Sequence, residues 1–201
     1  MIVRAPLLLP QRLINAFIES KIAWINDKKS LILKSPPVPT RQFVSGEKFW
    51  LFGELIPLRV VDDQKTALIF KEEFHLSSKS QGQASILFQN WYRAKARTVI
   101  TQRVELLANR YGFKYGRIRI SSARNRWGSC SSLGTLSFTW RLVMAPLEVI
   151  DYVVIHELVH LKIKNHSAAF WLEVGRLMPD YRLHKEWLRR NGHSLTLTGN
   201  E

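Results

Sequence analysis

The sequence predicts an α+β protein in which a helix packs on a small, mainly antiparallel sheet. Three observations predict this fold class. Apolar residues recur at helical spacing near the N-terminus, and short runs rich in β-branched and aromatic residues lie between residues 48 and 76. The third observation is the segment at residues 153–161, which is mostly apolar but carries two histidines and a glutamate. We expect an N-terminal subdomain over residues 1–80, with one helix and a small antiparallel sheet, and a core over residues 81–201.

The N-terminal part is expected to contain one helix after a brief extended piece at residues 1–4. Apolar residues recur at helical spacing over residues 10–27, and Pro10 suits a first helical turn. The proline-rich segment at residues 35–39 then predicts a linker. The three leucines at residues 7–9 form too short a run, bracketed by prolines, for a signal-peptide core or a membrane span. No membrane partner is therefore expected.

Four short pieces predict strands that pair as hairpins in a small antiparallel sheet. They lie at residues 49–52, 56–61, 67–70 and 74–76. Gly53 and Glu54 form the first turn between them. His75, in the last piece, is expected to be structural. A long helix follows over about residues 83–111, and Gly112 suits its C-terminal cap.

The second half of the chain predicts two further strands and three helices. The strands lie at residues 117–121 and 135–140. One helix begins at Pro146, whose entry turn carries acidic residues that suit the positive end of the helix dipole. Two more are expected at residues 167–178 and 181–190, separated by a proline and closed by a glycine. The long helix of residues 83–111 should pack beside the helix that begins at Pro146.

The segment His156-Glu157-Leu158-Val159-His160 carries the chemistry of this chain. Histidines four residues apart lie on one side of a helix, about 6 Å apart along its axis, and can direct ring nitrogens at one ion. Glu157 is displaced from that side, yet it can reach a water on the metal and take its proton. Two histidines alone are usually ordinary surface or core residues, but a buried, unpaired carboxylate between them would be costly. A Zn²⁺ site is therefore the better interpretation. Zinc brings the pKa of bound water to roughly 7, so a carboxylate suffices as the base.

Catalytic zinc commonly has three protein ligands, so a third is needed. His166 can serve only if the helix ends before it, because an unbroken helix would carry it about 9 Å along the axis and away from the metal. Residues 162–165 can supply that break, since Asn165 tolerates the left-handed conformation of a helix cap. Glu173 is the competitor, as glutamate is the third ligand in some zinc peptidases. We favour His166 on ligand preference and keep Glu173 as a residue that could orient a histidine.

A set of motifs in the second half of the chain carries a family resemblance. It consists of RWGSCSS at 126–132, LSFTWRL at 136–142, AP at 145–146, VIDYVV at 149–154, the HELVH segment, NHS at 165–167 and FW at 170–171. This set resembles the YgjP-type metallopeptidases, which are similar in active-site layout to the SprT-like and WLM-domain peptidases. The resemblance covers most of the chain and is strongest from Arg117 to Gly192.

The resemblance implies a compact, gluzincin-like zinc peptidase fold. It implies metal ligands at His156, His160 and His166 and a general base at Glu157. Members of this family commonly begin with an additional strand pair, and this chain is expected to start partway through it. Tyr181 could stabilise an oxyanion, as could His184, but ordinary surface placement is expected and neither is assigned a role.

The expected function is hydrolysis of peptide bonds in a protein or peptide substrate. An extended substrate is expected to add to the edge of the strand at 117–121 or of the strand at 135–140. The alternatives are a metal-dependent hydrolase of a non-peptide amide or ester, and a DNA-associated protease that acts on proteins bound to nucleic acid.

The net charge of +14 bears on the last alternative. One dense basic stretch contains a single acid, Glu105, among seven cations: Arg103, Arg110, Lys114, Arg117, Arg119, Arg124 and Arg126. Such a surface would attract phosphate backbones in a salt-dependent manner, or it simply keeps the protein in solution. Cys130 is the only cysteine, which excludes an internal disulfide and suits a cytoplasmic protein.

Overall fold

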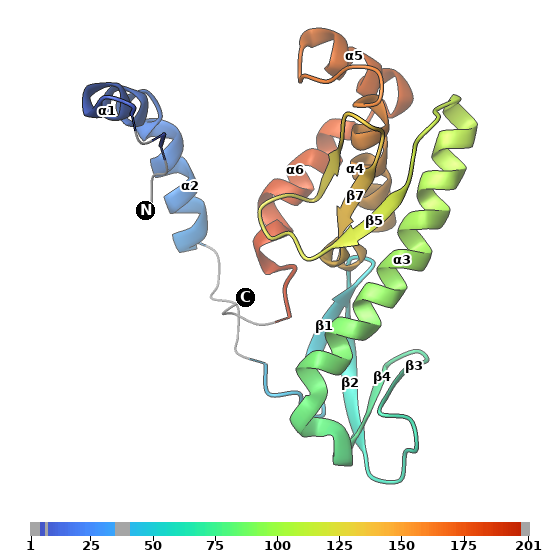
Figure 1. The fold of residues 1–201 in the computed structure, drawn as a ribbon. Coiled ribbons are helices and arrows are strands. Elements are labelled where there is room, and N and C mark those ends of the chain that lie inside the picture. Colours follow the sequence, from blue (N-terminus) through green and yellow to red (C-terminus); the bar gives the residue numbers. More distant parts are fainter. Residues whose placement is uncertain (1–4, 7, 35–40, 198–201) are drawn as a thin grey trace. The chain divides into compact units, whose positions relative to one another are not determined.

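The computed structural model describes residues 5–6, 8–34 and 41–197 (Figure 1). The chain forms two compact units, Met1–Pro37 and Val38–Glu201. The extended piece expected at residues 1–4 and the linker expected at 35–39 lie outside the described residues. The division of the chain into a subdomain over 1–80 and a core over 81–201 stays a prediction.

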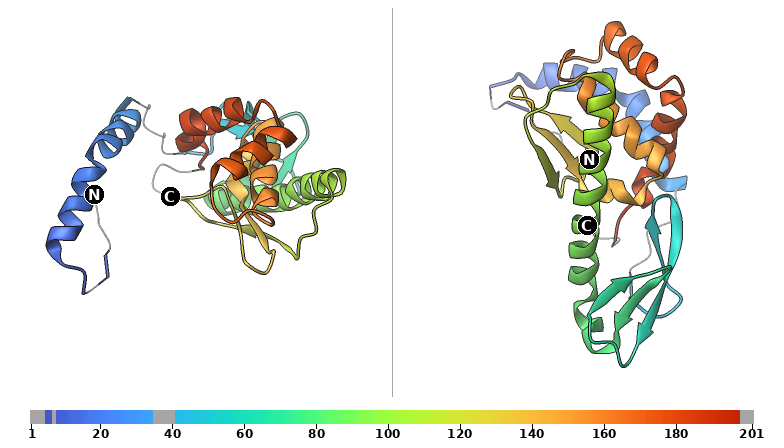
Figure 2. Two further views of the ribbon diagram at one scale, coloured as in Figure 1. Left: turned by 90° about the horizontal axis from the view of Figure 1, so that it is seen from above. Right: turned by 90° about the vertical axis from the view of Figure 1, so that its right-hand side faces the viewer.

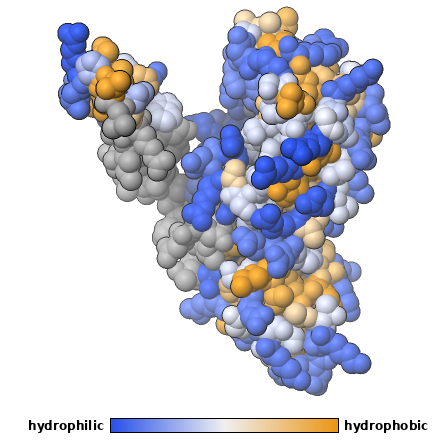
Figure 3. All heavy atoms as spheres, in the orientation of Figure 1, coloured by the Kyte–Doolittle hydropathy of each residue, from blue (hydrophilic) through white to orange (hydrophobic). Residues whose placement is uncertain are grey.

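The first unit contains two helices, α1 (Gln11–Ser20) and α2 (Ile22–Lys34), where the sequence predicts one. The break has a local cause. In a continuous helix the Lys21 N–H would donate to the Phe17 carbonyl, but the Ser20 hydroxyl donates to that carbonyl instead (2.7 Å). The Lys21 N–H then donates to the Ile18 carbonyl (3.0 Å). Helix α1 buries none of its residues. Apolar side chains therefore lie on the surface of this unit (Figure 3).

The second unit opens with a four-stranded sheet in the order β1-β2-β4-β3. Its strands are β1 (Lys48–Leu51), β2 (Glu54–Val61), β3 (Leu68–Phe70) and β4 (Phe74–Ser77). Two of the three pairings are antiparallel, as the sequence predicts, but β2 and β4 are parallel. The chain leaves β2, forms β3 at the sheet edge, and returns as β4 between the two. Alternation of apolar residues sets the face of a strand but not its neighbour, so this order was not predictable from the pattern.

The turn between β1 and β2 joins this sheet to the segment that precedes helix α4 (Leu147–Val159). Phe52 and Gly53 both have positive φ, 51° and 85°, which is the backbone of a tight hairpin turn. Their N–H groups donate to the carbonyls of Val143 and Met144, each at 3.0 Å. A Cβ on Gly53 would lie 2.6 Å from a side-chain carbon of Pro146. Glycine is therefore required here for both conformation and space.

The long helix α3 (Ala84–Tyr111) spans the unit, preceded by the 3-10 helix η1 (Ser78–Gln83). It ends as predicted at Gly112, which has φ 69°. Its first half packs on the first sheet, where the Tyr92 hydroxyl donates to the Trp50 carbonyl (2.6 Å). Figure 2 shows its second half running beside the second sheet and α4.

The second sheet is also mixed, in the order β5-β7-β6. Its strands are β5 (Ile118–Ser121), β6 (Gly128–Cys130) and β7 (Leu136–Thr139). Strand β7 lies in the middle, parallel to β5 and antiparallel to β6. Of the two strands predicted from the sequence, β7 therefore has no free edge, and β6 was not anticipated.

The remaining elements follow the predicted order. They are η2 (Trp140–Met144), α4 (Leu147–Val159), α5 (Ala168–Leu177), α6 (Tyr181–Asn191) and η3 (Gly192–Ser194). Helix α4 is nearly all buried, and a bidentate ion pair from Arg103 on α3 to its Asp151 (2.6 and 2.5 Å) fixes it against α3. An α+β fold with α4 at its centre is therefore confirmed. No described helix combines the length and apolar character that crossing a bilayer requires.

Candidate metal centre

The end of α4 brings the third histidine back toward the first two. The helix stops at Val159, and the following N–H groups of Leu161 and Ile163 bond to the carbonyls of Leu158 (3.0 Å) and Val159 (2.9 Å). These bonds satisfy the free carbonyls at the helix end. The predicted break before His166 is present. It does not use a left-handed Asn165, because that residue is not among the described residues with positive φ.

Three imidazoles converge at this break. The Nε2 atom of His166 lies 2.9 Å from that of His156 and 3.1 Å from that of His160. These are the only histidine, cysteine or carboxylate side chains among residues 5–6, 8–34 and 41–197 that gather in a way that could hold an ion. A tetrahedral zinc site with Zn–N bonds of about 2.0–2.1 Å places ligand nitrogens about 3.4 Å apart. The donor type and spacing fit such an ion.

The protonation of the imidazoles favours metal binding. Burial lowers the pKa of His156 to about 3, with smaller contributions from the charges of His160, His166 and Lys185. The pKa of His166 is also lowered, by burial and then by His160 and Lys185. Neutral rings keep a lone pair free for a metal, whereas protonated rings would exclude it.

Packing and hydrogen bonding orient the rings. His160 Nδ1 lies 3.0 Å from the Ile163 carbonyl, which accepts its proton and leaves Nε2 as the free donor atom for a ligand bond. The Phe170 ring contacts all three imidazoles, with centroid distances of 4.5 to 4.9 Å. Trp171 stacks on His166 at 5.7 Å. The FW pair of the sequence motif thus forms one wall of the centre.

Glu157 is buried beside the imidazoles, with 4% of its surface exposed. Its Oε2 atom is buried without a hydrogen-bond partner. Burial raises the pKa of Glu157 to about 8, and the charge of Arg126 partly offsets this. A carboxyl group with a pKa in this range can both take up and release a proton near neutral pH.

Gly128 on β6 makes room for that carboxylate. A Cβ at this position would lie 2.5 Å from Glu157 Oε1 and 2.7 Å from its Cγ. The glycine lies in the RWGSC motif, but nothing in the sequence pairs it with Glu157. Its role emerges only from the packing of β6 on α4.

We expect Gly128→Ala to lower the rate of substrate hydrolysis by at least about 10-fold while metal content stays unchanged. The new methyl group must displace the Glu157 carboxylate, and small misplacements of a reacting group are costly. Turnover and metal stoichiometry measured on the same preparation check this. Gly82→Ala is the matched control, since nothing lies within 4 Å of its Cβ position. Equal turnover in both variants would contradict the role of Gly128.

The Glu157 carboxyl should also affect stability when the metal is removed. Its ordinary pKa is 4.5 and its folded pKa about 8, so between these values the folded protein binds more protons and unfolding releases one. The free energy of unfolding then falls as pH rises. His156, with its lowered pKa, acts oppositely, but only below about pH 6.5. Between pH 6.5 and 8 we expect the wild type to lose stability relative to Glu157→Gln, measured by urea unfolding with a chelator. Parallel pH profiles would contradict this.

The competing ligand Glu173 is engaged elsewhere. Its two carboxylate oxygens accept hydrogen bonds from Arg176 at 2.8 and 2.9 Å. These hydrogen bonds lower its pKa. It does not belong to the group of side chains that could hold an ion. Tyr181 stacks on Trp171 (5.5 Å), so it borders the centre, while His184 pairs with Asp180 (3.2 Å).

The basic stretch is largely on the surface. Arg103 pairs with Asp151 and is partly buried. The other six cations are exposed: Arg110, Lys114, Arg117, Arg119, Arg124 and Arg126. They belong to the end of α3, to β5 and to the loops that flank β5.

Comparisons with known proteins identify a peptidase family. The family model described as "YgjP-like, metallopeptidase domain" matches residues 1–191. No curated protein matches the chain. Among solved structures, the metallopeptidase zymogen abylysin of Pyrococcus abyssi is 28% identical, with a TM-score of 0.40 over 45% of this chain and 90% of its own. The metallopeptidase zymogen jannalysin of Methanocaldococcus jannaschii is 22% identical, with a TM-score of 0.41 over 46% of this chain and 95% of its own. A mutant of Wss1 from Saccharomyces cerevisiae is 14% identical, with a TM-score of 0.34 over 65% of this chain and 91% of its own.

Proposed function

The chain belongs to the YgjP-like family of metallopeptidases, and from this premise we propose that it is a zinc-dependent peptidase with Glu157 as its general base. Membership of the family makes it a metal-dependent protease that acts on protein substrates. The single observation that carries the finer proposal is the convergence of three Nε2 atoms beside a buried carboxylate.

We assign the metal to His156, His160 and His166. When bound, the ion would polarise the substrate carbonyl and make a water acidic near neutral pH. With three protein ligands, the ion would remain accessible to water and to the substrate. Ligand chemistry favours zinc, since imidazole nitrogen in a set of three is a common catalytic zinc environment.

Glu157 moves the proton in this proposal. Its carboxylate takes a proton from the attacking water and later gives it to the nitrogen of the leaving amine. The unpaired Oε2 atom is available for that role, because no protein group competes for it. The raised pKa keeps the proton transferable in both directions.

The substrate strand is expected at β6. The sequence favoured the strand at 117–121, which is the edge strand β5, or the strand at 135–140, which is β7 and is enclosed by β5 and β6. Strand β6 is at the sheet edge and its Gly128 touches Glu157, so a peptide that adds to this edge would pass the proposed base.

Chelation tests the proposal. Wild-type protein is expected to hydrolyse an unfolded protein substrate, to lose that activity when the metal is removed, and to regain it with one equivalent of Zn²⁺. The fragments are detected by mass spectrometry. Hydrolysis that survives removal of the metal would contradict the proposal. Turnover of esters or small amides without any peptide cleavage would favour the alternative hydrolase.

A DNA-associated protease is the second candidate, favoured by the six exposed cations near β5. Binding to duplex and single-stranded DNA at two salt concentrations tests it. An affinity that falls steeply with salt is expected if these cations contact phosphates. The absence of binding at low salt would remove this candidate.

A further inference from the structure

A cavity of about 650 Å³ lies between α5 and the start of α6, apart from the three histidines. Its walls include Trp171, Leu172 and Tyr181, and its polar groups include Arg176 and Arg182. None of the residues that line it is acidic. The walls can cover apolar parts of a ligand while the guanidinium groups meet a negative charge.

Trp171 connects this cavity to the metal centre. The indole stacks on the His166 ring (5.7 Å) and on the Tyr181 ring (5.5 Å). Lys185 on α6 places its Nζ atom 4.0 Å from the centroid of the indole. A substrate side chain bound in this cavity would therefore be separated from the proposed metal ligand His166 by the indole of Trp171.

The cations around the cavity are not equally available. Arg176 is neutralised by a bidentate pair with Glu173. Arg182 donates to the Tyr181 hydroxyl (3.4 Å) and has no acidic partner in the described part of the chain. Lys185 likewise has no acidic partner in that part of the chain, and its Nζ atom lies over the indole. Of the nearby acids, Asp180 pairs with His184. Two unpaired positive charges therefore remain beside the aromatic wall.

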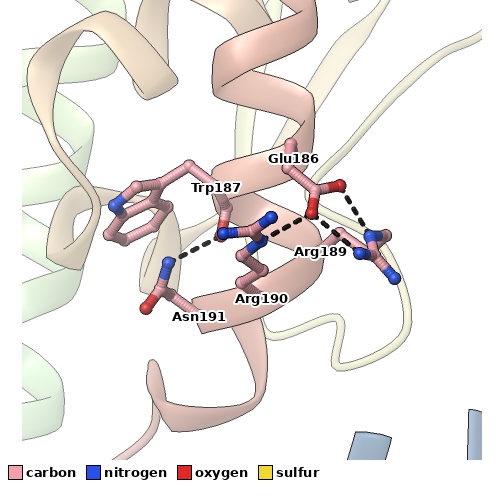
Figure 4. Close-up of polar contacts among 5 residues, drawn as sticks. All are labelled: Glu186, Trp187, Arg189, Arg190 and Asn191. Carbon is pink, nitrogen blue, oxygen red and sulfur yellow. Dashed lines mark hydrogen bonds and ion pairs between the residues drawn. The ribbon is translucent and has the colours of Figure 1, made fainter.

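Glu186, the acid next to Lys185 in the sequence, is also engaged. Figure 4 shows its carboxylate between Arg189 and Arg190, with contacts of 2.6 Å to each Nε atom. Its charge is more than balanced by these two guanidinium groups. It therefore does not neutralise Lys185.

We propose that the cavity between α5 and α6 is a specificity subsite that binds an acidic side chain of the peptide substrate. The groups that recognise its carboxylate are Arg182, which lines the cavity, and Lys185, which lies on the indole of the lining residue Trp171. This inference rests on the proposed peptidase function and names the substrate class. Guanidinium and ammonium groups suit a carboxylate, and Trp171 and Tyr181 suit the aliphatic part of a glutamate.

The test uses decapeptide libraries in which one position at a time is fixed as Glu or as its neutral isostere Gln. We expect wild-type, zinc-loaded protein to cleave one Glu library about 3- to 10-fold faster in kcat/KM than the matching Gln library, the range expected for an accessible charge-assisted contact. Arg182→Met and Lys185→Met should each reduce this ratio, mainly through KM. Arg190→Met is the matched control, because it removes one charge from the same helix at a residue that does not line the cavity and that pairs with Glu186.

Binding gives a second readout that does not depend on turnover. Fluorescein-labelled Glu and Gln peptides are titrated with the zinc-loaded Glu157→Gln protein and followed by anisotropy. The Glu peptide should bind more tightly than the Gln peptide. This difference in affinity should shrink when Glu157→Gln is combined with Arg182→Met or with Lys185→Met, but not when it is combined with Arg190→Met. A Glu/Gln ratio near one, or a ratio unchanged by both Arg182→Met and Lys185→Met, overturns the subsite.

The outcomes separate the subsite from the proposed function. If peptides are cleaved in a Glu157-dependent manner without preference for Glu, the subsite fails and the peptidase stands. If no peptide is cleaved but the Glu peptide binds through Arg182 and Lys185, the peptidase fails and the subsite stands. An oligothymidylate of ten nucleotides that displaces the Glu peptide more effectively than a decamer of glutamate does would assign the cavity to nucleic acid and overturn the proposal.

Discussion

Glu157→Gln is expected to lower peptide hydrolysis by about 10²- to 10⁴-fold, the usual contribution of a positioned general base, while the protein keeps one equivalent of zinc. The carboxylate is not among the three side chains that converge on the metal position, so the amide should leave that position intact. Glutamine has nearly the same size and should fit against Gly128, where space is tight. Turnover of the wild-type substrate and metal content on one preparation are the measurements.

Its control is a carboxylate on the same helix that the mechanism does not use. Asp151→Asn changes a partly buried acid on the same helix that pairs with Arg103, and it should alter stability more than turnover. Unchanged hydrolysis in Glu157→Gln would refute the assigned base. Loss of zinc in that variant would show instead that the carboxylate belongs to the metal site.

His166→Ala has the second large expected effect, the loss of tight zinc binding. Removing one of three ligands should weaken zinc affinity by more than about 100-fold, because even groups that only hydrogen-bond to a ligand contribute about 10- to 100-fold. The measurement is competition with a chromophoric zinc chelator, which reports affinity without activity. The thermal midpoint with and without zinc is a parallel check, since a ligand that binds the folded state raises it.

Glu173→Ala is the matched comparison, because Glu173 was the competing third ligand. Its carboxylate pairs with Arg176, so zinc affinity should change by less than about 3-fold, in line with the small worth of exposed ion pairs. Retention of zinc in His166→Ala together with its loss in Glu173→Ala would reverse the assignment.

The sequence predicted the fold class and family correctly, and the reason is local. Helix α3 ends at its predicted bound because Gly112 is a strong stop signal, and it begins within a residue of the predicted start. Helix α4 begins after Pro146, as predicted. The helix break before His166 was required by the geometry of metal binding, and it is present. The family inferred from the motifs is confirmed by the match over residues 1–191.

What the sequence did not predict depends on contacts between distant segments. The parallel pairing of β2 with β4 and the edge position of β6 follow from strand order, which periodicity does not encode. The fit of Gly128 against Glu157 joins residues 29 positions apart. The break at Lys21 depends on the Ser20 hydroxyl, and serine in a helical pattern is not by itself a stop signal.

A crystal structure of the zinc-reconstituted protein, with an anomalous difference map at the zinc edge, tests the central claim most directly. We predict one anomalous peak bound by Nε2 of His156, His160 and His166 at about 2.0–2.1 Å. A peak held by Glu173 in place of His166, or no peak between the three rings, would contradict the account.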